Sequence, residues 1–376
     1  MKRSLAALRF PVKRTRGRRY PEPPHPYRDE FQRDRDRIIH ARAFRRLEDK
    51  TQVFTPALSD HFRNRLTHTI EVAQIARTAA SVLELNEQLT EALALAHDLG
   101  HPPFAHAGEE ELNRQMSRFG DRFDHNLHAL RIVEWFEQRY AAFPGLNLSF
   151  EVREGIAKHS RDFEPGEFHE LDEYLPGLRP PLEAQLIDLA DEIAYNTADL
   201  DDAFAAGMFD LDQLCAEVPV CEQLLRAART QFPNAATRTL FSEVLRNLID
   251  RLVSGLIEGT LVTAACAGAE DAEQVRLCPR RLAALAPETA AISGALKNFL
   301  RQNVYFCAEL AEERARVSRM IGELFEFYLK SPESLPVPYQ VQAESTPLHR
   351  VICDYIAGMT DGYFRRIYER TVKMGK

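Results

Sequence analysis

The sequence predicts an all-α protein, in which a helical core is followed by additional C-terminal helices. Apolar residues recur at a helical spacing along most of the 376-residue chain, whereas no segment shows the sustained alternation expected of a half-buried strand. A hydrophobic content of 45% and a charged content of 28% are typical of a globular protein with a sizeable core. These observations argue against a mainly β fold and against a disordered chain.

The apolar spacing predicts helices over 28–49, 63–83, 90–99, 109–119, 126–140, 150–159, 182–206, 240–257, 290–310 and 316–329, and two more within 347–369. Residues 50–54 are expected to form a short loop or β-like segment, and the polar residues 161–181 a long surface loop. We therefore expect three consecutive parts. These are a basic, Pro-rich arm over 1–27, a core over 28–206, and a helical region over 207–376 that packs on the core and contributes to assembly.

Turn and capping residues support several of these boundaries. Gly100 is expected to stop the helix over 90–99, and Gly120 to close the helix over 109–119. The run Asp-His-Asn at 124–126 is suited to capping the helix that follows it.

Positive charge is concentrated at the N-terminus, although the whole chain has a net charge of −8. Residues 1–50 contain sixteen Lys or Arg and seven Asp or Glu, which gives a net charge of +9. The first twenty residues contain eight basic side chains and no acidic one. Such a segment is either a nucleic-acid-binding arm or a disordered, solvated tail, and we favour the tail for residues 1–20.

Six cysteines are scattered along the chain without any Cys-x-x-Cys pair. This distribution is typical of reduced thiols, so it predicts a cytoplasmic protein and argues against a disulfide framework or a zinc ribbon. No apolar run approaches the ~18 residues needed to cross a bilayer. No apolar segment follows the basic N-terminus as it would in a signal peptide. We expect no membrane partner.

Histidines and carboxylates gather around the segment 90–111. His97 and Asp98 end an apolar helical run, and His101, His106 and Glu109 follow within a few residues. Imidazole and carboxylate groups are common ligands of first-row divalent metals. Taken alone, a His-Asp pair is more often an ordinary helix end with surface histidines, so the assignment needs further support.

The helix predicted over 182–206 carries a second concentration of acidic residues. Asp191, Tyr195 and Asp199 are separated by four residues each, so they lie on one face of that helix. Apolar residues are interleaved with them. We therefore expect the helix to be largely buried and its acidic groups to need partners.

The order His68, His97-Asp98, Asp191 resembles the H…HD…D signature of the HD superfamily of metal phosphohydrolases. Longer segments resemble those of bacterial dGTPase-like deoxynucleoside triphosphate triphosphohydrolases. They are FQRDRDRIIH (31–40), AFRRL (43–47), KTQVF (50–54), RLTHT (65–69), AHDLGHPPF (96–104), ADEIAY (190–195) and DYIAGMTD (354–361). The resemblance covers about 28–368, nearly the whole chain, and implies an HD-domain core. One departure is Ala105, where the family more often has glycine.

The resemblance implies a role for each of three groups of residues. The metal ligands would be His68, His97, Asp98 and Asp191. The acid/base pair would be His106 and Glu109. The substrate-binding residues would be Gln52 and Asp199 at the deoxyribose 3′-hydroxyl, Tyr195 against the sugar, and Arg65, His101, His125, Asn126 and Lys158 near the triphosphate.

The reaction implied is metal-dependent hydrolysis of a dGTP-like deoxynucleoside triphosphate to the deoxynucleoside and inorganic triphosphate. The metal would polarise a phosphoryl oxygen, and a histidine with a pKa near ~6.5 would protonate the departing 5′-oxygen. Mn²⁺ or Mg²⁺ is expected first, with Fe²⁺ and Zn²⁺ as alternatives. The partners implied are the dNTP substrate, further copies of the chain in a homo-oligomer such as a hexamer, an allosteric dNTP and single-stranded DNA.

Two other interpretations stay open. One is an HD phosphohydrolase that acts on a different nucleotide, but the Arg-rich segment 31–46 argues against a monophosphate substrate, which needs fewer cations. The other is a nucleotide-sensing or DNA-binding protein with vestigial hydrolysis, against which the complete set of ligands and the His106–Glu109 pair argue. The base preference cannot be read from the sequence.

Overall fold

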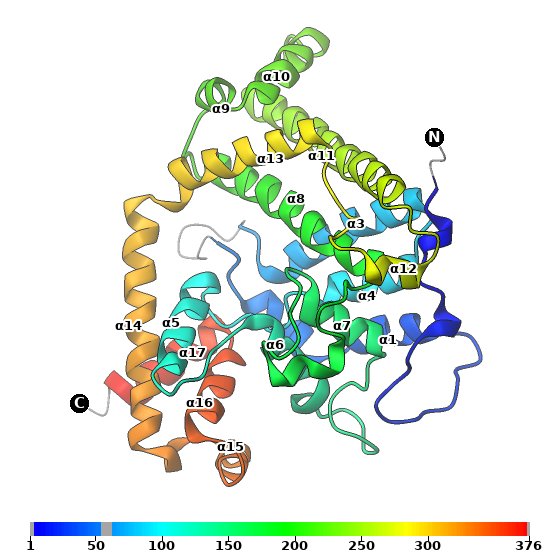
Figure 1. Cartoon of the computed structure of the whole chain (residues 1–376). Helices are drawn as coiled ribbons and strands as arrows, with labels where there is room; N and C mark the ends of the chain where they lie inside the picture. The colour runs from blue at the N-terminus through cyan, green and yellow to red at the C-terminus, as the bar shows by residue number, and fades with distance from the viewer. Residues whose placement is uncertain (1–3, 54–61, 374–376) are drawn as a thin grey trace. The chain divides into compact units, whose positions relative to one another are not determined.

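The computed structural model describes residues 4–53 and 62–373, which form helices and no β-strand (Figure 1). Strand-like pairing within these ranges is limited to three isolated bridges. The all-α prediction is therefore confirmed. Residues 1–3 of the expected arm and Phe54 of the expected loop lie outside the described residues. In the part of the chain that is described, no helix is long and apolar enough to cross a membrane.

The chain forms two compact units, each assembled from three separate segments. The first unit comprises Met1–Asp36, His68–Leu95 and Leu148–Cys307, and the second comprises Arg37–Thr67, Ala96–Asn147 and Ala308–Lys376. This division differs from the three consecutive parts that we expected. Three helices contain residues of both units: α1 (Glu30–Ile39), α3 (Arg65–Leu83) and α4 (Glu87–Ala96).

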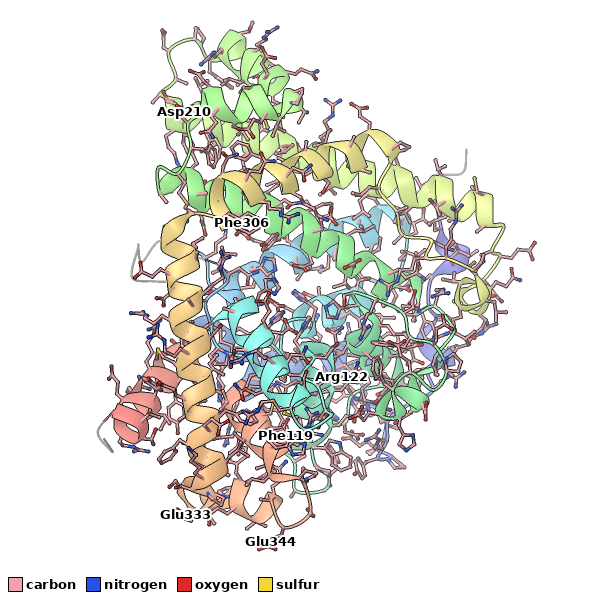
Figure 2. All side chains as sticks on the ribbon, turned by 60° about the vertical axis from the view of Figure 1, so that its left-hand side comes forward. Phe119, Arg122, Asp210, Phe306, Glu333 and Glu344 are labelled. Atoms are coloured by element: carbon pink, nitrogen blue, oxygen red, sulfur yellow. The ribbon has the colours of Figure 1, made fainter. Side chains whose placement is uncertain are left out.

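The first unit contains most of the long helices. They are α7 (Phe150–Lys158), α8 (Leu182–Ala205), α9 (Leu211–Glu217), α10 (Pro219–Gln231), α11 (Thr237–Ala267), α12 (Ala272–Leu277) and α13 (Pro287–Leu300). Helices α8, α11 and α13 pack against one another (Figure 1). Asp210, labelled in Figure 2, lies directly before α9. Its side chain caps this helix by accepting a hydrogen bond from the backbone of Gln213 at 2.8 Å. Gly255 of α11 permits the close approach of α13, because a Cβ there would lie 1.8 Å from the Thr289 hydroxyl.

The second unit is built around the long helix α14. Its helices are α2 (Arg42–Arg46), α5 (Ala105–Ser117), α6 (His125–Arg131), α14 (Ala308–Lys330), α15 (Val337–Gln342), α16 (Leu348–Ala357) and α17 (Asp361–Tyr368). Helix α14 lies beside α5 and α16, with Phe119 just beyond the end of α5 (Figures 1 and 2). Leu112, Ile321 and Ile356, from α5, α14 and α16, are fully buried in the shared core. The C-terminal segment is therefore part of the packing that holds α5.

Several helix boundaries differ from those expected. The helix over 28–49 is broken at His40-Ala41, where Ala41 is extended, and continues as α2 and a short 3-10 turn at Leu47–Asp49. Helix α4 starts earlier than expected, because the Asn86 side chain caps it by accepting from the Leu89 backbone at 3.2 Å. The expected surface loop over 161–181 contains a 3-10 turn, His169–Tyr174, with a buried tyrosine at its end.

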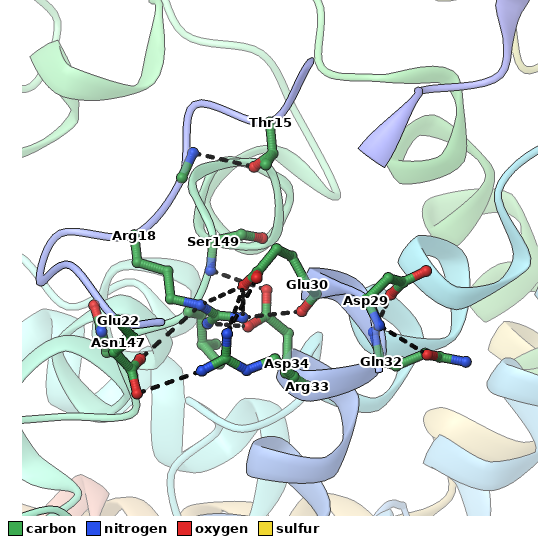
Figure 3. Close-up of polar contacts among 12 residues, drawn as sticks. Thr15, Arg18, Glu22, Asp29, Glu30, Gln32, Arg33, Asp34, Asn147 and Ser149 are labelled. Atoms are coloured by element: carbon green, nitrogen blue, oxygen red, sulfur yellow. Dashed lines mark hydrogen bonds and ion pairs between the residues drawn. The ribbon is translucent and has the colours of Figure 1, made fainter. Parts of the chain in front are cut away.

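The expectation of a disordered tail at residues 1–20 is wrong for the residues described from Ser4 onward. Phe10 is buried, and its backbone N–H donates to the carboxylate of Glu183 at 2.8 Å. Arg18 forms ion pairs with Glu30 and Asp34, and the Asp34 carboxylate also accepts from a backbone N–H of the first unit (Figure 3). The basic side chains of this segment are thus partly used to neutralise buried acids, which charge counting along the sequence could not reveal.

Candidate active site

The His97-Asp98 pair follows α4 directly, and a glycine brings a second helix close to it. Helix α4 ends at Ala96, so Gly100 does not stop it, and Gly100 is not among the residues with positive φ. A Cβ at Gly100 would instead lie 1.9 Å from the backbone oxygen of His125 and 2.4 Å from the backbone nitrogen of Ala129. Gly100 is therefore required for the close approach of α6, a role different from the one we expected.

Asp98 lies among cationic and imidazole groups within the second unit. Arg65 donates to one carboxylate oxygen at 2.7 Å, and the nearest ring nitrogens of His101 and His97 lie 3.1 Å and 3.5 Å from the other. Burial alone would raise the pKa of Asp98, but the charge of Arg65 and the two histidines outweigh it and hold that pKa well below its usual range. Asp98 is therefore ionised and can act as a ligand or an acceptor.

Glu109 contacts two histidines from different elements and forms a hydrogen bond with one of them, His125. His125 Nδ1 lies 2.7 Å from Glu109 Oε1, and the backbone N–H of His125 donates to the same oxygen at 3.2 Å. His106 Nδ1 lies 3.7 Å from Glu109 Oε2, and the side chain of His106 is 66% exposed. Glu109 is thus fixed on one side by His125, while its other oxygen faces an imidazole that a ligand can reach.

The protonation of this cluster follows from its contacts. Burial would raise the pKa of Glu109, but its contacts with His106 and His125 lower it well below the usual range. Burial would lower the pKa of His125, yet the hydrogen bond to Glu109 raises it. The neighbouring ring of His101, stacked on His125 at 4.0 Å, has its pKa lowered by burial and by the charge of Arg65. The Glu109–His125 contact therefore favours a protonated His125, whereas the neighbouring His101 is neutral.

The backbone that leads into His106 is strained. Phe104 and Ala105 both have positive φ, at 64° and 54°, and α5 begins at Ala105, four residues earlier than expected. L-residues with a side chain rarely adopt this conformation, and such outliers concentrate at functional sites. Ala105 is also the position at which the resemblance described above would favour glycine. The strain and the departure therefore concern the same residue, directly before His106.

Asp361, at the start of α17, ties the C-terminal segment to this turn. Its carboxylate accepts from the backbone N–H of Thr51 at 3.0 Å and from that of Phe104 at 3.0 Å. The buried ammonium of Lys50 donates to the backbone oxygens of His101 and Ala357. Sequence reasoning assigned no role to Asp361 or Lys50, although both lie in quoted motifs. The contacts between these distant segments only become visible in the structure.

The remaining metal-ligand candidates are a histidine and a carboxylate of the first unit. His68 Nε2 lies 2.7 Å from Asp191 Oδ1. In the second unit, His97 and Asp98 present the same two donor types. Imidazole nitrogen and carboxylate oxygen are ligands that suit a first-row divalent cation. The side chains present therefore fit the metal that the HD signature implies.

The other substrate-binding candidates have different surroundings. Asp199, in the first unit, accepts a hydrogen bond from the hydroxyl of Tyr305, whose ring lies 5.8 Å from that of Tyr195. Gln52, in the second unit, is buried, and its side-chain oxygen has no hydrogen-bond partner within the described ranges. Lys158 is 1% exposed, and its ammonium donates to a glutamate and two backbone oxygens. Lys158 therefore has a structural role in the folded chain.

Asn126 lies in the first turn of α6, next to His125. Its backbone N–H donates to the capping carboxylate of Asp124 at 2.9 Å, which confirms the expected cap, and the residue is 2% exposed. The same cap fixes the start of α6 and thereby the position of His125. Sequence reasoning had placed His125 near the triphosphate and had not paired it with Glu109, because residues sixteen apart give no local signal.

Comparison with known proteins gives matches over nearly the whole chain. The HD domain family matches residues 65–196, and the phosphohydrolase-associated domain family matches residues 283–370. A deoxyguanosinetriphosphate triphosphohydrolase-like protein from Azoarcus sp. (strain BH72) is 47% identical over 363 residues, covering 96% of this chain and 95% of the relative. Proteins of the same name from Bordetella parapertussis and Geobacter metallireducens are each 44% identical. The first match covers 99% of this chain and 97% of the relative, and the second 94% and 92%.

Proposed function

The chain belongs to the family of deoxyguanosinetriphosphate triphosphohydrolase-like proteins, and we propose that it hydrolyses deoxynucleoside triphosphates to the deoxynucleoside and inorganic triphosphate. The observation that carries this proposal is the Glu109 cluster. In this cluster the carboxylate of Glu109 contacts the imidazole of His125, which is fixed, and the exposed imidazole of His106. The ionised Asp98 of the HD motif lies beside them. A protein that only senses nucleotides has no need of such an arrangement.

We assign the metal to His68, His97, Asp98 and Asp191, all of which lie within the matched HD domain. A divalent ion supplies Lewis acidity toward a phosphoryl oxygen and a source of nucleophilic water at neutral pH. Mn²⁺ and Mg²⁺ are the first candidates, and Fe²⁺ and Zn²⁺ suit the same donors. Arg65, which donates to Asp98, neutralises charge next to these ligands.

We assign proton transfer to His106, with Glu109 as the residue that orients it. The leaving group is the 5′-oxygen of a deoxynucleoside, an alkoxide that needs a proton as its bond to phosphorus breaks. The exposed His106 can meet this oxygen, while His125 holds Glu109 in place from the other side. Glu109 raises the pKa of His125 and so favours its cationic form, which would attract the anionic triphosphate.

The proposed substrate-binding residues contact two parts of the nucleotide, the triphosphate and the deoxyribose. We assign the triphosphate to Arg65, His101, His125 and Asn126. We assign the deoxyribose to Gln52, Tyr195 and Asp199. The buried side-chain oxygen of Gln52 supports this assignment, since a sugar hydroxyl would give it a donor. Lys158 is no longer included, because protein acceptors surround its ammonium.

The test is an assay of inorganic triphosphate release with each of the four dNTPs, in the presence of Mn²⁺ or Mg²⁺. Release of triphosphate supports the proposal and also gives the base preference. Release of monophosphate or diphosphate would favour an HD phosphohydrolase with a different cleavage site. Nucleotide binding without any hydrolysis would favour the sensing or DNA-binding alternative.

Further parts of the proposal rest on family resemblance alone. They are a cytoplasmic location, a homo-oligomer such as a hexamer, and regulation by a dNTP or by single-stranded DNA. Size-exclusion chromatography with light scattering tests the oligomer. Activity measured with and without single-stranded DNA, and with mixtures of dNTPs, tests the regulation.

A further inference from the structure

Three side chains beside the HD motif form a second group of metal-type donors. The group consists of His101, Glu109 and His125, and one nitrogen or oxygen of each lies within 4.8 Å of the others. All three residues belong to the second unit. The metal of the HD motif is assigned to four other residues, so this group is a separate donor set.

The ring of His101 is oriented by Asp98. Its Nε2 lies 3.1 Å from an oxygen of the ionised Asp98, which can only accept a hydrogen bond. The neutral ring therefore carries its hydrogen on Nε2 and has a lone pair on Nδ1. In the part of the chain that the structure describes, this buried Nδ1 has no hydrogen-bond partner, and it lies 4.0 Å from Glu109 Oε2. Two electron-rich atoms thus face each other, an arrangement that a cation between them would stabilise.

His125 presents its own Nδ1 to the same carboxylate. That nitrogen lies 2.7 Å from Glu109 Oε1, and its ring is stacked on that of His101 with centroids 4.0 Å apart. Two features of the backbone fix His125 in this place. Gly100 permits the close approach of α6, and the side chain of Asp124 caps the same helix. A donor set held in this way needs little rearrangement to bind an ion.

The donor types favour zinc. Two imidazole nitrogens and one carboxylate oxygen are a common zinc ligand set, with a fourth position left to water. Zinc bonds of about 2.0–2.2 Å place neighbouring donor atoms of a tetrahedron roughly 3.4 Å apart. The two nitrogen–oxygen separations of 2.7 Å and 4.0 Å lie on either side of that value. Sites of this kind bind Zn²⁺ more tightly than Mn²⁺.

We propose that His101, Glu109 and His125 form an inhibitory zinc site, in which both histidines bind through Nδ1. The hydrogen between His125 Nδ1 and Glu109 leaves to solvent as the ion binds, because a ligating imidazole nitrogen must be deprotonated. Glu109 bound to zinc no longer orients His106, whose Nδ1 lies 3.7 Å from its carboxylate. The inhibition rests on the proposed function, whereas the binding of zinc does not.

Zinc binding is measured without nucleotide, by competition between the full-length protein and a chromophoric chelator. We expect the wild type to bind one more Zn²⁺ per chain than Glu109→Gln does. The glutamine oxygen can still accept from the backbone N–H of His125, so this variant should keep the start of α6. Glu110→Gln is the matched control, because it removes an exposed carboxylate from the next position of the same helix and should bind zinc as the wild type does.

Two further variants locate the ion. His101→Ala should bind the additional Zn²⁺ at least about tenfold more weakly, since even the loss of an outer-shell partner costs roughly 10–100-fold in metal affinity. Asp191→Ala removes a carboxylate assigned to the HD motif and should keep the ion that depends on Glu109. Circular dichroism of each variant checks that its fold is retained. If Glu109→Gln and Glu110→Gln bound zinc with the same stoichiometry and affinity, the site would not exist.

Inhibition is measured on the wild type loaded with Mn²⁺. Added Zn²⁺ should lower triphosphate release at the concentration that fills the Glu109-dependent site, and a zinc chelator should restore it. Full activity with that site filled would overturn the inhibitory role. A protein that binds zinc through Glu109 and releases no triphosphate under any condition would refute the proposed function and leave the zinc site standing.

Discussion

Replacing Ala105 by glycine should increase the free energy of unfolding, although the same change inside a regular helix decreases it. Ala105 has a φ of 54°, directly after Phe104 at 64°. A side chain in this left-handed conformation costs about 1–2 kcal/mol, whereas glycine adds roughly 0.5–1 kcal/mol of backbone entropy to the unfolded chain. The midpoints of these two ranges differ by about 0.75 kcal/mol, which is the stabilisation expected for glycine.

Equilibrium denaturation followed by circular dichroism measures this difference. Ala107→Gly is the matched control, since it lies two residues further along the same helix and should lose about 1 kcal/mol or more. Glycine at position 105 should make the turn before His106 more flexible. We therefore expect the Ala105→Gly protein to release triphosphate a few-fold more slowly, measured on the same preparations. If Ala105→Gly destabilised the protein as much as Ala107→Gly does, the positive φ would not be a source of strain.

Four further outcomes are expected. His106→Ala should retain its metal, measured by elemental analysis, and lose about 10²–10⁴-fold in turnover; near-normal triphosphate release would end the assignment of the proton donor. Asp191→Ala should lose metal while keeping its circular dichroism spectrum, and a wild-type metal content would contradict its role as a ligand. Gly100→Ala should lower both the melting temperature and turnover, because the added methyl would lie 1.9 Å from the His125 backbone oxygen. Burial lowers the pKa of Lys50 to about 7, so between pH 7 and about 10 the unfolded chain binds a proton that the folded chain lacks. Stability should therefore rise with pH across this window relative to Lys50→Met, and identical slopes in urea titrations would refute the shift.

The helical spacing of apolar residues predicted most of the fold, and several helix boundaries were also predicted correctly. Helix α3 ends at Leu83 as expected, and α8 spans Leu182–Ala205 against an expected 182–206. The break at Ala41 was missed, because no glycine or proline marks it. The early start of α5 was missed for a related reason, since Phe104 and Ala105 adopt a conformation that their residue types disfavour.

The chemical types at the candidate site were also accessible from the sequence, but their pairing was not. The motif order identified His97, Asp98 and Glu109, whereas the contact of Glu109 with His125 depends on how α5 and α6 pack. Charge counting suggested a free basic tail, yet Arg18 is paired with Asp34 and Glu30 in the folded chain. The periodicity of apolar residues shows which face of a helix is buried. It does not show which residue, distant in the sequence, will form an ion pair with a given charged side chain.

The contacts of Asp361 have a consequence for synthesis of the protein on the ribosome. The Asp361 carboxylate accepts from the backbone of Thr51 and from that of Phe104, which precede it by 310 and 257 residues. A nascent chain that has already released the HD motif from the exit tunnel lacks the residue that fixes the turn before His106. The contact that fixes the turn before His106 can therefore form only after Asp361 has been synthesised.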